Sequence, residues 1–181
     1  MKSIIWFRGK DLRLTDHPAF DAAGPNALLV FVVDPYFFSP EAAQGLPHRM
    51  QYMLDALEAL EKSVADRGGK LWLIEGRSTT VIPKLAKAFE ADQVVAMRWS
   101  EPFGRERDRR IEAALDIPFV LLEGETLLPP GQIRTQGGTP YTVFTPFANR
   151  FRSQYEAPRG SGTPREIVPV DLPPGFQGVR C

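Results

Sequence analysis

Short apolar runs alternate with amphipathic segments along most of this 181-residue chain, and this alternation limits the possible fold more than any other feature. The runs are of strand length and lie at residues 4–7, 27–33, 70–75, 93–99 and 117–122. Strands that alternate with helices form a parallel sheet whose crossover helices cover both faces. We therefore predict an α/β fold, a Rossmann-like, five-stranded, doubly wound parallel sheet with helices on both faces.

The predicted helices are recognised by apolar residues that recur every three or four positions. The clearest stripe, within 47–67, consists of Met50, Met53, Leu54, Leu57, Leu60 and Val64. Other helices are expected at 16–23 with Asp16 as N-cap, at 78–90 with Ser78 as N-cap, and at 105–115 and 146–155.

The composition changes after residue 155. From Ala157 to Cys181 there are five prolines and four glycines in 25 residues, with no apolar periodicity. Such a segment buries too little apolar surface to offset the entropy lost on ordering. We therefore expect one α/β domain at 1–155 and a flexible tail or linker remnant at 156–181.

The charge and residue counts exclude several classes of protein. Lys+Arg and Asp+Glu both total 22, so no net positive field favours direct binding of DNA. A single cysteine and two histidines argue against a disulfide framework and a metal site. Neither a membrane-spanning apolar run nor a signal-peptide pattern is found, so we expect no membrane partner and a cytoplasmic location.

The usual catalytic signatures of this fold class are missing. The sequence contains no GxGxxG, GxxxxGK[ST], GxSxG or HExxH motif. This argues against a dinucleotide-dependent dehydrogenase, a P-loop NTPase and an α/β-hydrolase, and we assign no catalytic residue.

Several charged residues are expected at the carboxyl edge of the sheet, where open α/β folds bind ligands. Arg8, Asp11 and Arg13 follow the first strand and form either part of a site or a salt-bridged turn. Arg49, at the start of the longest helix, faces either an anion or solvent. Glu101 lies directly after the fourth strand.

Two further stretches have simpler interpretations. The run RERDRR at 105–110 pairs Glu106 with Arg110 at helical spacing and is interpreted as a solvated helix face. The aromatic stretch GTPYTVFTPFANRF at 138–151 would serve as a flap that covers the sheet edge.

Together, these pieces resemble the amino-terminal α/β domain of the DNA photolyase/cryptochrome family. WFRGKDLRLTDHPA at 6–19 is similar to that family's WFRxDLRLxDNPAL, with one extra residue between Arg8 and Asp11. YTVFTPF at 141–147 matches the element PYxVFTPF, and LLPPGQIRTQGGTPY before it also fits. The resemblance covers residues 3–155.

The resemblance implies an activity for the whole family, and it also implies that this chain alone lacks that activity. Family members repair ultraviolet-induced pyrimidine dimers, or signal in response to light, with an FAD held in a helical domain that follows the α/β domain. The sequence lacks that domain, so we expect the chain alone not to repair DNA, and to use FAD only with a partner helical domain. The α/β domain of the family holds a second, light-harvesting chromophore.

The resemblance also implies a chromophore site at the carboxyl edge of the sheet. Its apolar walls would be Phe7, Phe37, Phe38, Met50, Trp99 and Phe103, and its polar anchors Arg8, Asp34, Arg49 and Glu101. Arginine suits anionic ring oxygens or phosphate, and carboxylates suit ring N–H groups or ribityl hydroxyls.

The identity of the chromophore follows from one short motif. Folate-binding members carry Asn-Glu where this chain has Phe103-Gly104, which makes methenyltetrahydrofolate less favoured. EPFGRERD resembles the EPYGRxRD of members that bind a deazaflavin, so a deazaflavin or FMN is preferred.

Three alternatives to an antenna domain stay open. The chain could be half of a split photolyase completed by a separate FAD domain, which an exposed apolar docking surface would favour. It could be a small-nucleotide-binding or interaction protein that has kept only the fold. It could also be a truncated or non-functional remnant.

Overall fold

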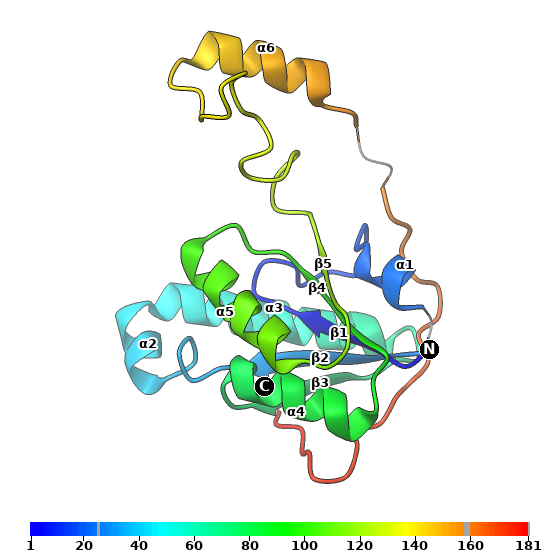
Figure 1. Cartoon of the computed structure of the whole chain (residues 1–181). Coiled ribbons are helices and arrows are strands. Elements are labelled where there is room, and N and C mark those ends of the chain that lie inside the picture. The colour runs from blue at the N-terminus through cyan, green and yellow to red at the C-terminus, as the bar shows by residue number, and fades with distance from the viewer. Residues whose placement is uncertain (25, 158–159, 181) are drawn as a thin grey trace.

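The computed structural model describes residues 1–24, 26–157 and 160–180, so Pro25 and the lone Cys181 lie outside it. Its centre is a five-stranded sheet in which every strand pair is parallel. The strands are β1 (Ser3–Phe7), β2 (Ala27–Val33), β3 (Leu71–Glu75), β4 (Gln93–Met97) and β5 (Phe119–Leu122), in the order β3-β2-β1-β4-β5. The predicted five-stranded, doubly wound parallel sheet is confirmed (Figure 1).

Helices cover both faces of the sheet (Figure 1). The helices are α1 (Ala19–Ala23), α2 (Pro40–Gly45), α3 (Pro47–Ala65), α4 (Ser78–Phe89), α5 (Pro102–Ala114) and α6 (Phe144–Gln154). Side chains of α1 and α3 pack in one hydrophobic cluster, and those of α4 and α5 pack in another. The short helix α2 lies between β2 and α3.

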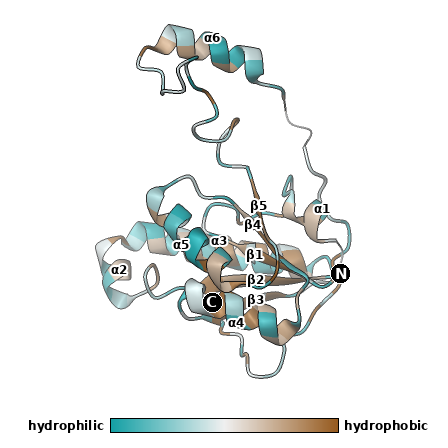
Figure 2. Cartoon of the chain, viewed as in Figure 1, coloured by the Kyte–Doolittle hydropathy of each residue, from teal (hydrophilic) through white to brown (hydrophobic). Residues whose placement is uncertain are grey.

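The two clusters are separated by the alternation of side chains along the central strand β1. Ile5 and Phe7 point to the side of α3, where Leu57 and Leu60 are buried. Ile4 and Trp6 point to the side of α4. Because both faces of β1 are buried, its sequence is continuously apolar rather than alternating, and Figure 2 shows the strands as the most hydrophobic part of the chain.

The strand order creates a crevice at the carboxyl end of β1. After β1 the chain crosses to β2 and β3 on one side, whereas β4 and β5 extend the sheet on the other side. The loops that leave β1 and β4 therefore diverge, and such a switch point is where open α/β sheets bind ligands. The topology thus supports the predicted ligand edge.

Two predicted N-caps are wrong. Asp16 is not an N-cap: α1 begins at Ala19 after Pro18, and Asp16 has a left-handed backbone with φ of 52°. Ser78 is the first residue inside α4, and Arg77 occupies the N-cap position. Both Asp16 and Ser78 have the right residue type for a cap, but tertiary hydrogen bonds use their side chains, to Ser161 and Asp34.

The arm that leads to α6 extends away from the sheet, in contrast to the expected flap. Residues 123–143 carry the chain outward, and α6 lies far from the strands (Figure 1). No residue of α6 is buried, and Phe144 is 75% exposed. The aromatic stretch therefore does not cover the sheet edge.

The segment after residue 160 packs on the domain, although its composition predicted a flexible tail. Ile167 is buried between α3 and the sheet. Trp72 Nε1 donates to the carbonyl of Val170 at 2.8 Å, and the Val179 N–H donates to that of Leu73 at 2.8 Å. The segment has no apolar periodicity, but a few contacts along edge strand β3 hold it against the domain. The boundary at residue 155 stays a prediction.

Among the described residues, no helix is both long enough and apolar enough to cross a bilayer.

Candidate functional site

A cavity of about 650 Å³ opens at the carboxyl ends of β1, β2 and β4. This volume lies within the usual range of small-molecule sites, roughly 300–1,000 Å³. All the residues predicted for the chromophore site line it: Phe7, Arg8, Asp34, Phe37, Phe38, Arg49, Met50, Trp99, Glu101 and Phe103. The structure thus brings together residues from four separate segments, because each follows a strand or begins a helix at the same edge of the sheet.

One wall of the cavity is a group of packed aromatic rings. Tyr36 and Phe103 stack with centroids 4.4 Å apart and an angle of 14° between their planes. Phe37 meets Phe103 edge-on at 5.5 Å and Trp99 at 6.1 Å. These contacts join the loop after β2 to the start of α5. Tyr36 was missed by the sequence reasoning, although it directly precedes two phenylalanines that were chosen.

Asp34 already has hydrogen-bond partners within the protein. Its Oδ2 accepts from the backbone N–H and the hydroxyl of Ser78, both at 2.8 Å. Its Oδ1 accepts from the Tyr36 N–H at 3.1 Å. The carboxylate therefore fixes the start of α4 and the turn after β2, and its predicted role as a ligand anchor stays a prediction.

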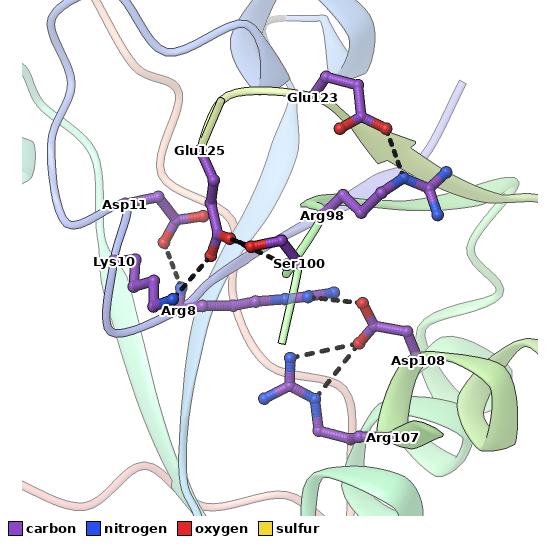
Figure 3. Close-up of polar contacts among 9 residues, drawn as sticks. All are labelled: Arg8, Lys10, Asp11, Arg98, Ser100, Arg107, Asp108, Glu123 and Glu125. Carbon is purple, nitrogen blue, oxygen red and sulfur yellow. Dashed lines mark hydrogen bonds and ion pairs between the residues drawn. The ribbon is translucent and has the colours of Figure 1, made fainter. Parts of the chain in front are cut away.

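Glu101 belongs to an ion-pair cluster on the rim of the cavity. Lys10 contacts Glu101 and lies 3.1 Å from Glu125 Oε1. Glu125 Oε2 accepts hydrogen bonds from the backbone N–H and the hydroxyl of Ser100. Although burial opposes it, these hydrogen bonds and Lys10 hold the pKa of Glu125 below its usual value. The cluster ties together the loops that follow β1, β4 and β5 (Figure 3).

Arg8 lies beneath the cavity with its guanidinium buried. Its Nη1 donates to Asp108 Oδ2 at 2.9 Å, and its guanidinium carbon lies 4.3 Å from the centre of the Trp6 ring. Its Nε and Nη2 are buried without a hydrogen-bond partner among the described residues. Burial lowers the pKa of Arg8 to about 10, even though Asp108 favours the charged form. Arg8 is therefore held by α5 rather than exposed on the cavity wall.

The predicted solvated face of α5 is wrong at two positions. Glu106 does pair in solvent with Arg109 at 2.9 Å and Arg110 at 2.8 Å. Arg107 and Asp108, however, are 7% and 4% exposed and face the sheet. The buried residues of α5 are Gly104, Arg107, Asp108 and Ile111, which lie three and four positions apart on one side of the helix. Gly104 and Ile111 are the two uncharged members of this buried side. Their spacing could have predicted it from the sequence, although the residues between them are all charged.

Arg107 is held between two tryptophans at the cavity. Its guanidinium carbon lies 4.9 Å from the Trp6 ring centre and 4.6 Å from the Trp99 ring centre. Its Nε and Nη2 face Asp108 Oδ1 at 3.3 and 3.2 Å. Each carboxylate oxygen of Asp108 therefore accepts hydrogen bonds from a different guanidinium group, as Figure 3 shows. Burial lowers the pKa of Arg107, with Asp108 acting in the opposite direction.

The loop after β1 contains a second buried pair, Asp11 and His17. Asp11 Oδ1 accepts from the Arg8 N–H, and its Oδ2 lies 3.8 Å from His17 Nε2. Burial raises the pKa of Asp11 to about 7 and lowers that of His17 to about 4. Arg13 donates to the carbonyls of Thr15 and Asp16. Asp11 and Arg13 thus hold the turn, which is one of the two interpretations left open by the sequence.

Arg49 and Met50 line the cavity from the first turn of α3, where Arg49 is exposed and Met50 is half-buried. Within the described ranges, no group of three or more histidine, cysteine or carboxylate side chains is placed to hold a metal ion.

The chain was compared with known families and proteins. The family model described as DNA photolyase matches residues 3–167. A deoxyribodipyrimidine photo-lyase from Thermus thermophilus is 37% identical over 148 residues, covering 82% of this chain and 33% of that protein. One from a Synechococcus species is 34% identical over 177 residues, covering 94% of this chain and 36% of that protein. The chain thus spans about a third of the length of these relatives.

Solved structures agree with these matches. A class III photolyase from Agrobacterium tumefaciens superposes with a TM-score of 0.77 at 28% identity, over 96% of this chain and 36% of that chain. A Synechocystis cryptochrome has the same fold, with a TM-score of 0.80 at 24% identity, over 97% of this chain and 38% of that chain. By its sequence and its amino-terminal α/β architecture, the chain therefore belongs to the DNA photolyase family.

Proposed function

We propose that this domain binds a light-harvesting antenna chromophore in the cavity at the carboxyl edge of the sheet, with a deazaflavin or FMN preferred over methenyltetrahydrofolate. The observation that carries the proposal is the cavity itself. It lies at the switch point of the sheet and has a wall of packed aromatic rings that suits a planar ligand.

The polar groups of the cavity fit the acceptor-rich edge of such a ring. Trp99 Nε1 is buried with no acceptor among the described residues, although Trp99 lines the cavity. Buried donors of this kind normally have a partner, so a ligand carbonyl or ring nitrogen would satisfy it. One related structure, an archaeal photolyase from Sulfolobus tokodaii, is described as holding two FAD molecules and as implying a novel light-harvesting cofactor.

Direct binding to the purified chain tests this function. Riboflavin, FMN, a deazariboflavin and methenyltetrahydrofolate would each be titrated while ligand fluorescence is followed. Phe37→Ala removes an aromatic ring from the cavity wall, whereas Phe144→Ala removes an exposed ring on α6 and serves as the matched control. We expect Phe37→Ala to weaken flavin or deazaflavin binding by about tenfold or more, because a lost aromatic contact costs about 1–3 kcal/mol.

Two results would refute the antenna proposal. One is a wild-type chain that binds none of the four chromophores, which would favour a non-functional remnant. The other is equal binding by the two phenylalanine variants. The proposal includes a cytoplasmic location, which cell fractionation would test, and it includes no direct contact with DNA.

A second candidate function is supported by an aromatic cluster on and beside α6. Phe147 contacts the rings of Tyr141, Phe144 and Phe151, and Phe151 contacts that of Tyr155, at centroid distances between 5.7 and 6.5 Å. Phe144 is exposed and the other four residues are half-buried. Contiguous apolar surface that is open to solvent marks interaction sites, so we propose that this cluster docks a separate FAD-binding helical domain in a split photolyase.

Reconstitution tests the split arrangement. The chain would be mixed with FAD and the remaining part of the Thermus thermophilus relative, and light-driven dimer reversal would be measured. Turnover that appears only in the mixture and is lost in Phe147→Ser, but not in Leu54→Ser on the exposed side of α3, would support it. Turnover by the chain alone, or none in the mixture, would contradict it.

A further inference from the structure

We infer that the cavity selects ligands whose polar edge is an anionic hydrogen-bond acceptor, and that Arg107 is the residue that determines this preference. The inference deepens the proposed function, because it concerns the chemistry of the ligand in the same cavity. It rests on the hydrogen-bond donors around Trp99 and on the fixed position of Arg107, and not on the identity of the chromophore.

The first observation is a pair of buried guanidinium groups beside the cavity. Arg8 and Arg107 are both at least nine-tenths buried, and both contact the same carboxylate, that of Asp108. Asp34 and Asp11 also stabilise the charged form of Arg107. Because Arg107 lines the cavity, its guanidinium presents a cation to a ligand there.

The second observation is an excess of hydrogen-bond donors. Arg107 uses Nε and Nη2 on Asp108, and its Nη1 has no acceptor in the part of the chain that the structure describes. Trp99 Nε1 also lacks one. Glu101, by contrast, already faces Lys10 with one carboxylate oxygen at the rim. The open donors of Trp99 and Arg107 therefore favour a ligand that presents acceptor oxygens to them.

The third observation is that Arg107 is held in place before any ligand arrives. Its guanidinium lies between the rings of Trp6 and Trp99 and against Asp108. Ring faces stabilise a cation, and a fixed side chain loses little entropy when it binds. At the rim, Lys10 is paired with Glu101 and Glu125, and Arg49 is exposed. The buried, fixed arginine is therefore the group that discriminates by charge.

A pair of matched probes tests the inference without a flavin. Naphthalenesulfonate and naphthalenesulfonamide have the same ring and nearly the same shape, but only the first is an anion. We expect the wild-type chain to bind the sulfonate about tenfold or more tightly than the sulfonamide. Arg107→Gln should remove this preference, and Arg107→Lys should keep part of it. Arg109→Gln, on the exposed side of the same helix, should leave it unchanged.

Folding of each variant would be checked by circular dichroism and urea unfolding. Should Arg107→Gln not fold, Trp99→Phe keeps an aromatic ring but removes the indole N–H, and should reduce the preference by threefold or more. Equal wild-type binding of the two probes, binding of neither, or a preference that survives in every folded variant would overturn the inference.

The same titrations separate this inference from the proposed function. Selectivity for the sulfonate without binding of any flavin would keep the anion preference and reject the antenna role. Flavin binding without selectivity for the sulfonate would keep the antenna role and reject the anion preference.

Discussion

Replacing Asp11 by Asn should change how the stability of this domain depends on pH. Burial raises the pKa of Asp11 from 3.8 to about 7, and burial lowers the pKa of its neighbour His17 from 6.5 to about 4. Between these values the folded state keeps a proton on Asp11 that the unfolded state has lost. It also lacks a proton on His17 that the unfolded state has gained.

The two effects have opposite signs. Stability rises with pH wherever the unfolded state binds more protons, so His17 stabilises the fold increasingly from pH 4 to 6.5. Asp11 acts in reverse: its stabilising contribution is complete below pH 4 and is lost as the pH rises toward 7. A difference of one in pKa corresponds to about 1.4 kcal/mol. The full contributions are therefore on the order of 4 kcal/mol for Asp11 and 3 kcal/mol for His17. Because one falls and the other rises with pH, their effects on the pH dependence of stability largely cancel in the wild-type chain.

The variants separate the two contributions. From pH 4.5 to 6.5, the free energy of unfolding of Asp11→Asn, relative to wild type, should rise by up to about 3 kcal/mol. That of His17→Asn should fall by about 2 kcal/mol over the same range. Urea unfolding followed by circular dichroism at several pH values measures both. His48→Asn, whose side chain is exposed on α3, is the control. Differences from wild type that do not vary with pH would refute the reasoning.

Three more predictions concern packing and charge, and urea unfolding tests the first two of them. Ile167→Ala should destabilise the domain by about 2–4 kcal/mol, because a buried side chain is truncated, whereas Val168→Ala on the exposed side should change it little; equal effects would contradict the packing of this segment. Asp108→Asn should cost about 3–5 kcal/mol, since it leaves two buried guanidinium groups without their carboxylate, and the exposed Glu106→Gln should cost less than 1. Gly104→Ala would place a Cβ 2.5 Å from that of Trp99, so tryptophan fluorescence and chromophore affinity should both change, while Gly45→Ala, which has open space, should alter neither.

The sheet could be predicted because its signals are local. Strands buried on both faces must be continuously apolar, and the helices between them carry regular stripes such as Leu57, Leu60 and Val64. The cavity residues could be proposed for a related reason. Residues that directly follow parallel strands, such as Arg8 and Trp99, meet at one edge whatever the details of packing.

What the sequence did not reveal depends on contacts between distant segments. Arg107 and Asp108 lie within a run of alternating charges, and their burial depends on partners about a hundred positions away, Trp6 for Arg107 and Arg8 for Asp108. Asp16 and Ser78 have side chains typical of helix caps, but partners elsewhere in the fold use them. The position of α6 likewise does not follow from its amphipathic pattern, since that pattern does not specify which surface it will meet.

The segment that follows residue 160 also constrains the order in which the molecule is completed. Strand β3 lies at an edge of the sheet, and the partners of Trp72 and Leu73 along that edge are Val170 and Val179. During synthesis this edge stays open until about a hundred more residues have been made, and an open strand edge is a template for pairing with other chains. On the ribosome, this edge of the early sheet is therefore exposed to misassembly until residues 170–179 have been made.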